Sequence, residues 1–126
     1  MTQQPIQTDL NSVLSHEEIH AIDAELSHVP YKSGAAIDAL KIVQERRGWV
    51  SDDCLMAIAR HLDMSAEQME GIATFYNLIY RRPVGEKVIL FCDSVSCWIC
   101  DCDGIKAKIS QYLQIDYGET TTDNRY

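Results

Sequence analysis

The sequence predicts an α/β (α+β) fold in which a helical N-terminal bundle precedes a shorter part built around a strand. The first half carries repeated helix-capping patterns with apolar residues at helical spacing. An apolar run at residues 87–91 then shows no helical period, and a C-x4-C pair follows it directly. With 126 residues, the chain is long enough for one domain, or one domain with a helical extension.

Four capped helices are expected between residues 15 and 76. Their N-caps are expected to be serines, namely Ser15, Ser33, Ser51 and Ser65. Glu18 and Gln68 lie three residues after the first and last of these serines, which is the spacing of a capping box. Gly48 is expected to supply the C-terminal stop of the second helix.

The second half is expected to hold a buried strand at residues 87–91 and a helix capped by Asp103. A strand and helix of this kind need a further parallel strand, which would begin at Arg125. The chain is therefore expected to be cut short at its C-terminal end. The expected domains are a disordered polar tail at 1–14, the helical bundle at 15–76, and the partial second domain at 77–126.

Composition excludes several classes of function. The formal net charge is −8, which is the wrong sign for a surface that binds nucleic acid. No apolar stretch approaches the roughly 20 residues that a membrane span requires, so no membrane insertion is expected. The polar start shows no export signal, which favours a cytoplasmic protein.

Five cysteines in such a chain favour metal or redox chemistry over a disulfide framework. Cys92 and Cys97 share one loop after the expected strand, and two thiolates on one loop can converge on a soft metal ion. An iron–sulfur cluster with all-cysteine ligation needs four thiolates. Cys100 and Cys102 are candidate substitutes for the missing pair, in a plant-type ferredoxin spacing or a zinc site, and ordinary loop variation is the alternative.

Other side chains have both a functional and a structural interpretation. Ser94 and Ser96 could donate hydrogen bonds to the cysteine sulfurs and raise a reduction potential. Cys54 is either an activated thiol at a helix start or a small buried residue. Arg81 and Arg82 either pair with acidic groups of a partner or lie in a solvated turn.

The aromatic residues Phe75, Tyr76 and Tyr80 are interpreted as core or partner-contact residues, and an electron relay is the alternative.

Several sequence runs together resemble the family formed by the E subunits of bacterial NADH-quinone oxidoreductase, which is respiratory complex I. The runs are ALKIVQ at 39–44, RGWV at 47–50, EGIATFY at 70–76, RPVG at 82–85 and CDSVSC at 92–97. The resemblance implies a helical bundle followed by a thioredoxin-like [2Fe-2S] ferredoxin domain. It also implies a cluster held by a C-x4-C pair, which matches Cys92 and Cys97, and by a later C-x3-C pair, which would fall beyond Tyr126.

The same resemblance implies a function. A member of this family is a non-catalytic electron carrier that docks on the flavin- and NADH-binding subunit and belongs to the peripheral arm of the complex. It works at the cytoplasmic face of the inner membrane, and its cluster accepts one electron from the flavin. Two alternatives are a docking protein without a cluster and the equivalent module of a NAD-linked formate dehydrogenase or hydrogenase.

Overall fold

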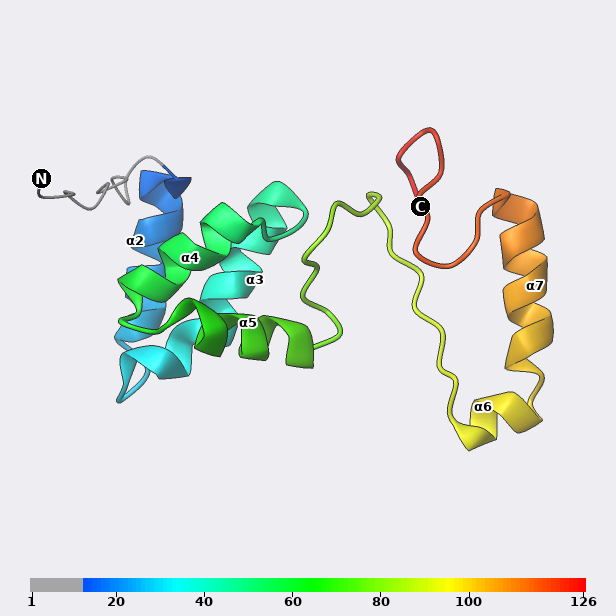
Figure 1. Ribbon diagram of the computed structural model, residues 1–126, viewed down its shortest axis with the longest axis horizontal. Coiled ribbons are helices and arrows are strands. Elements are labelled where there is room, and N and C mark those ends of the chain that lie inside the picture. The colour runs from blue at the N-terminus through cyan, green and yellow to red at the C-terminus, as the bar shows by residue number, and fades with distance from the viewer. Residues whose placement is uncertain (1–12) are drawn as a thin grey trace, which may run out of the picture. The chain divides into compact units, whose positions relative to one another are not determined.

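The computed structural model describes residues 13–126, and the chain divides after Pro83 into two compact units (Figure 1). The first unit holds helices α2 (His16–Leu26), η1 (Lys32–Ala35), α3 (Ala36–Arg47), α4 (Asp52–His61) and α5 (Ala66–Phe75). The second unit, Val84–Tyr126, holds α6 (Val95–Ile99) and α7 (Cys102–Leu113). Most of the tail expected at 1–14 lies outside the described residues, but Leu14 is buried in the core.

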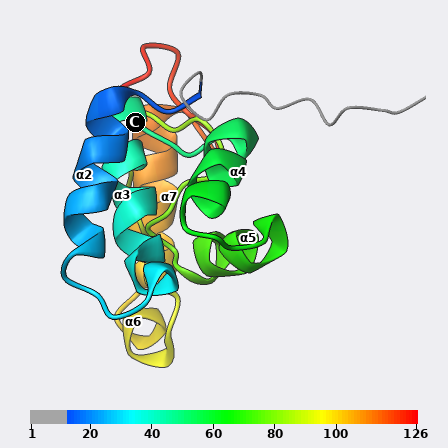
Figure 2. The same cartoon turned by 90° about the vertical axis from the view of Figure 1, so that its left-hand side faces the viewer.

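The first unit is a helical bundle in which α3 contacts every other helix. Helices α2 and α3 lie side by side, and α4 and α5 pack on each other and on α3 (Figure 2). Its core consists of aliphatic side chains and alanines together with Cys54; the largest fully buried members are Leu14, Ile22, Leu40, Ile58, Leu62 and Met69. Within residues 13–126, no helix is both long and apolar enough to cross a bilayer.

Three of the four expected serine caps are confirmed. Ser15 and Ser65 each form a complete capping box, and the Ser51 side chain accepts a hydrogen bond from the Cys54 amide. The Ser33 prediction is wrong, because Ser33 lies inside the 3₁₀ turn η1 and α3 begins after Ala35 without a side-chain cap. Gly48 ends α3 as expected, and its backbone lies in the left-handed region at φ 84°.

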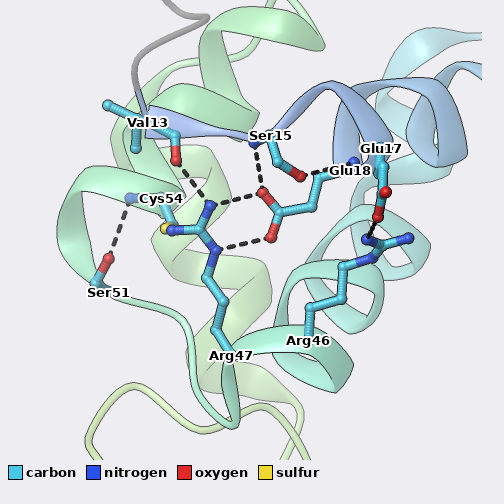
Figure 3. Close-up of polar contacts among 8 residues, drawn as sticks. All are labelled: Val13, Ser15, Glu17, Glu18, Arg46, Arg47, Ser51 and Cys54. Carbon is cyan, nitrogen blue, oxygen red and sulfur yellow. Dashed lines mark hydrogen bonds and ion pairs between the residues drawn. The ribbon is translucent and has the colours of Figure 1, made fainter.

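A buried carboxylate joins α2 to the end of α3. The Glu18 side chain is only 2% exposed, and its two oxygens accept hydrogen bonds from Arg47 Nε at 2.7 Å and Nη2 at 2.6 Å (Figure 3). The Ser15 amide donates to the same carboxylate at 2.8 Å. The arginine holds the pKa of Glu18 below its usual value. The capping box therefore also anchors a charged pair between two helices.

Hydrogen bonds also fix the segment that follows α5. The Gln44 side chain donates to the Leu78 carbonyl at 2.7 Å and accepts from the Tyr80 amide at 2.7 Å. The Val50 amide donates to the Tyr80 carbonyl at 2.8 Å. This segment is consequently held in one path over α3 without being helical.

The strand expected at 87–91 is not confirmed, since no strand is found in residues 13–126. Glu86 and Lys87 donate backbone hydrogen bonds to the carbonyls of Asn124 and Arg125, at 3.0 and 2.9 Å, but the pairing does not continue into a ladder. Strands require such a ladder along their length. The apolar run is accordingly extended and partly exposed, with Leu90 54% exposed.

The final helix begins earlier than expected. Its N-cap is Asp101, which has a left-handed backbone at φ 63° and accepts from the Gly104 amide, and not Asp103. Asp103 instead lies within the first turn, where its carboxylate approaches Lys106 at 3.7 Å.

Candidate metal centre

The candidate centre is the short loop and helix that carry Cys92 and Cys97. Cys92 ends the extended segment, and its sulfur lies 3.1 Å from the hydroxyl of Ser94. Ser94 is the N-cap residue of α6, and Cys97 is the third residue of that helix. A side chain at this third position points back toward the N-cap. The loop therefore directs both sulfurs toward Ser94.

The two thiols differ in how readily they ionise. The Ser94 hydroxyl is the chief cause that lowers the pKa of Cys92, aided by the Ser94 backbone and by the Cys97 thiol. The Cys92 sulfur in turn raises the pKa of Cys97, because it accepts a hydrogen bond from the Cys97 thiol and because a negative charge on Cys92 disfavours a second one on Cys97. A soft metal ion binds cysteine as thiolate, so metal binding at this pair would release the protons that the two thiols hold.

The other two cysteines lie further along the chain, at the end of α6 and the start of α7. Cys100 is exposed at the C-cap of α6, whereas Cys102 is buried at the start of α7, with its sulfur 4.0 Å from an Asp103 carboxylate oxygen. Across residues 13–126, no group of three or more cysteine, histidine or acidic side chains is placed to hold a metal ion. The role of Cys100 and Cys102 as substitute ligands stays a prediction.

An aromatic contact that the sequence did not reveal supports the loop. The ring of Phe91, the residue before Cys92, meets the ring of Tyr117 edge-on, with centroids 6.1 Å apart. The Lys106 ammonium lies 4.7 Å from the centroid of the Tyr117 ring. Tyr117 thus links the end of the extended segment to α7. Its only sequence signal is a lone aromatic residue in a polar stretch.

The serine predictions have different outcomes. Ser94 contacts the Cys92 sulfur as expected, but within the described chain no hydrogen bond joins the Ser96 side chain to a sulfur. Cys54 is 2% exposed within the helical core, which fits a small buried residue.

Arg81 pairs with acidic groups of its own chain rather than of a partner, and its side chain does not lie in a solvated turn. Its guanidinium donates to Glu70 at 3.0 Å, to Asp52 at 2.6 Å and to the Val50 carbonyl, all within the helical unit. Phe75, in contrast, is 79% exposed and belongs to no core.

Chemically, the pair fits half of an all-cysteine [2Fe-2S] ligand set. Such a cluster is held by four thiolates, and Cys92 and Cys97 together supply two on one loop. Ser94 adds a hydroxyl donor beside one sulfur, and hydrogen bonds of this kind tune the electronic properties of iron–sulfur centres.

Comparisons with known proteins agree with this chemistry. A family model described as "Thioredoxin-like [2Fe-2S] ferredoxin" matches residues 22–126. The E subunit of NADH-quinone oxidoreductase from Escherichia coli (strain K12) is 48% identical over 113 residues, which cover 90% of this chain and 68% of that protein. The same-named protein of Pseudomonas aeruginosa is 44% identical over 121 residues, which cover 96% of this chain and 72% of that protein. The one from Buchnera aphidicola of Acyrthosiphon pisum is 44% identical over 113 residues, which cover 90% of this chain and 70% of that protein. The chain therefore belongs to the thioredoxin-like [2Fe-2S] ferredoxin family.

Proposed function

We propose that this chain is an electron-carrier subunit of NADH-quinone oxidoreductase in which Cys92 and Cys97 provide two ligands of a [2Fe-2S] cluster. The observation that carries the proposal is the placement of both thiols around Ser94 within the segment that matches the ferredoxin family. When bound, the cluster would supply one-electron transfer. The electron donor would be the flavin of the NADH-binding subunit.

The residues of this chain would prepare the two ligands. Cys92 ionises more readily than an ordinary thiol because Ser94 lowers its pKa, which would favour loss of its proton on metal binding. Metal binding would then displace the proton that Cys97 shares with it. Tyr117 would keep the end of the extended segment against α7 while the ligands bind.

The helical unit would serve to dock the chain on its partners in the peripheral arm. Phe75, Tyr76 and Leu78 are 79, 42 and 55% exposed, next to the segment that Gln44 and Arg81 hold in place. Exposed aromatic and aliphatic side chains on a fixed backbone are typical of protein interfaces. Docking there would place the chain in the complex at the cytoplasmic face of the inner membrane.

A docking protein without a cluster is a second candidate. The observation that favours it is the exposure of Phe75, Tyr76 and Leu78 in the helical unit, which is separate from the unit that carries the cysteine loop. The three relatives all carry the name of the respiratory enzyme, which favours that complex over a formate dehydrogenase or hydrogenase module.

The two candidates are separated by iron content and electron paramagnetic resonance of the assembled complex. We expect Cys92→Ser and Cys97→Ser each to abolish or shift the signal of this chain's [2Fe-2S] cluster, while Cys100→Ser leaves it unchanged. Loss of the cluster with retained assembly would show that docking and electron transfer are separate properties. A complex that contains the wild-type chain but lacks its [2Fe-2S] signal would leave only the docking function.

A further inference from the structure

We propose that Cys92 and Cys97 also form a thiol–disulfide exchange site, which low-molecular-weight disulfides such as glutathione disulfide convert to an intramolecular disulfide in the metal-free protein. This proposal concerns the metal-free chain and does not depend on the electron-carrier function. It follows from the positions of the two sulfurs and from their different accessibility.

The start of α6 determines where the Cys92 and Cys97 sulfurs lie. In the two capping boxes of the helical unit, the side chain of the third helical residue lies beside the N-cap residue. Glu18 accepts a hydrogen bond from the Ser15 amide at 2.8 Å, and Gln68 accepts one from the Ser65 amide at 3.1 Å. Cys97 occupies the same position relative to Ser94. The Cys92 sulfur lies 3.1 Å from the Ser94 hydroxyl, and a hydrogen bond joins the Cys92 and Cys97 side chains, so the two sulfurs are neighbours.

The different accessibility of the two thiols sets the order in which they react. Cys92 is exposed, so a soluble disulfide can reach it, whereas Cys97 is half-buried beside it. Cys100 is at the opposite end of α6, and Cys102 is buried at the start of α7. Cys97 is therefore the thiol placed to act after Cys92.

Glutathione disulfide is the oxidant in this reaction and accepts the two electrons that the cysteine pair loses. The Cys92 thiolate attacks one sulfur of glutathione disulfide, which forms a mixed disulfide and releases one glutathione thiolate. Cys97 then loses its proton to solvent and attacks the Cys92 sulfur, so the Cys92–Cys97 bond forms and the second glutathione thiolate leaves. The protein loses two hydrogens, and one glutathione disulfide is reduced to two glutathione molecules. The bond removes both thiols from metal binding until a reductant restores them.

Intact-mass and peptide mapping of the reduced, metal-free chain after treatment with glutathione disulfide tests the proposal. Chymotryptic cleavage after Trp98 separates Cys92 and Cys97 from Cys100 and Cys102. We expect a protein that has lost two hydrogens, with the bond in the peptide that contains Cys92 and Cys97. We expect Cys97→Ser to retain glutathione on Cys92 instead, and Cys100→Ser to behave like the wild type.

A stable glutathione adduct on wild-type Cys92, a bond to Cys100 or Cys102, or no reaction at Cys92 would each overturn the proposal. The wild-type peptide map decides this even if Cys97→Ser fails to fold. Because this experiment contains no iron, its failure leaves the cluster assay of the assembled complex unaffected.

Discussion

Replacement of Glu18 by glutamine is expected to destabilise the helical unit much more than replacement of its neighbour Glu17. Both carboxylates lie in the first turn of α2 and pair with consecutive arginines of α3. The Glu18 side chain is 2% exposed, whereas that of Glu17 is 79% exposed. The two substitutions remove the same charge from different environments.

The magnitude follows from burial. Removal of one partner from a buried ion pair costs about 3–5 kcal/mol, because the other charge is left without compensation. The Arg47 side chain is 36% exposed, so water recovers part of this cost, and glutamine keeps an acceptor for the Ser15 amide. We expect Glu18→Gln to lower the free energy of unfolding by about 2 kcal/mol. Because the pair of Glu17 and Arg46 is exposed, we expect Glu17→Gln to lower the free energy of unfolding by only about 0.5 kcal/mol.

Urea unfolding followed by tryptophan fluorescence measures this difference. Trp49 lies in the helical unit, and a Trp98→Phe background removes the signal of the second unit. Equal losses for Glu18→Gln and Glu17→Gln would refute the argument from burial.

The Glu18–Arg47 pair also makes the stability of the helical unit depend on pH, in a direction that follows from the pKa of Glu18. Because Arg47 lowers the pKa of Glu18 in the folded state, the folded state favours the ionised carboxylate. This stabilisation is present above the ordinary glutamate pKa of 4.5 and is lost as the pH falls through the lower folded value. The stability difference between wild type and Glu18→Gln should therefore shrink on acidification below that pH, and a difference that grows instead would contradict the assignment.

Two further substitutions test how backbone segments are held. At Gly85 an added Cβ would lie 2.8 Å from the Tyr126 carbonyl carbon. Gly85→Ala should therefore break the hydrogen bond from the Glu86 amide to the Asn124 carbonyl and speed hydrogen exchange of that amide. Unchanged exchange would contradict this close approach. Arg81→Ala should cost about 1–2 kcal/mol through lost charge-assisted hydrogen bonds, while the exposed neighbour Arg82→Ala should cost less than about 0.5 kcal/mol. Urea unfolding compares these two, and similar costs would show that the Arg81 contacts contribute little.

Local interactions made the helices predictable. The capping boxes at Ser15 and Ser65 use contacts three residues apart, so the sequence contains both partners at a fixed spacing. The Ser33 prediction failed because a 3₁₀ turn occupies the expected cap position. Asp101 was missed as the cap of α7 because it adopts a left-handed backbone, which is uncommon for residues other than glycine.

Long-range interactions were not predictable in the same way. The apolar run at 87–91 has strand composition, but a strand also needs a backbone partner, and only Glu86 and Lys87 find one, at Asn124 and Arg125. Within the candidate centre, the C-x4-C spacing and Ser94 are local and were visible in the sequence. Tyr117 lies far along the chain, so its contact with Phe91 required the fold.

Whether Cys92 and Cys97 bind iron is tested by thiol alkylation of the assembled complex before and after a chelator removes the iron. We predict that both thiols resist alkylation while the [2Fe-2S] signal is present and become reactive together as the iron is released, with Cys100 unchanged throughout. Alkylation of Cys92 and Cys97 in a complex that keeps its iron and its signal would contradict the account.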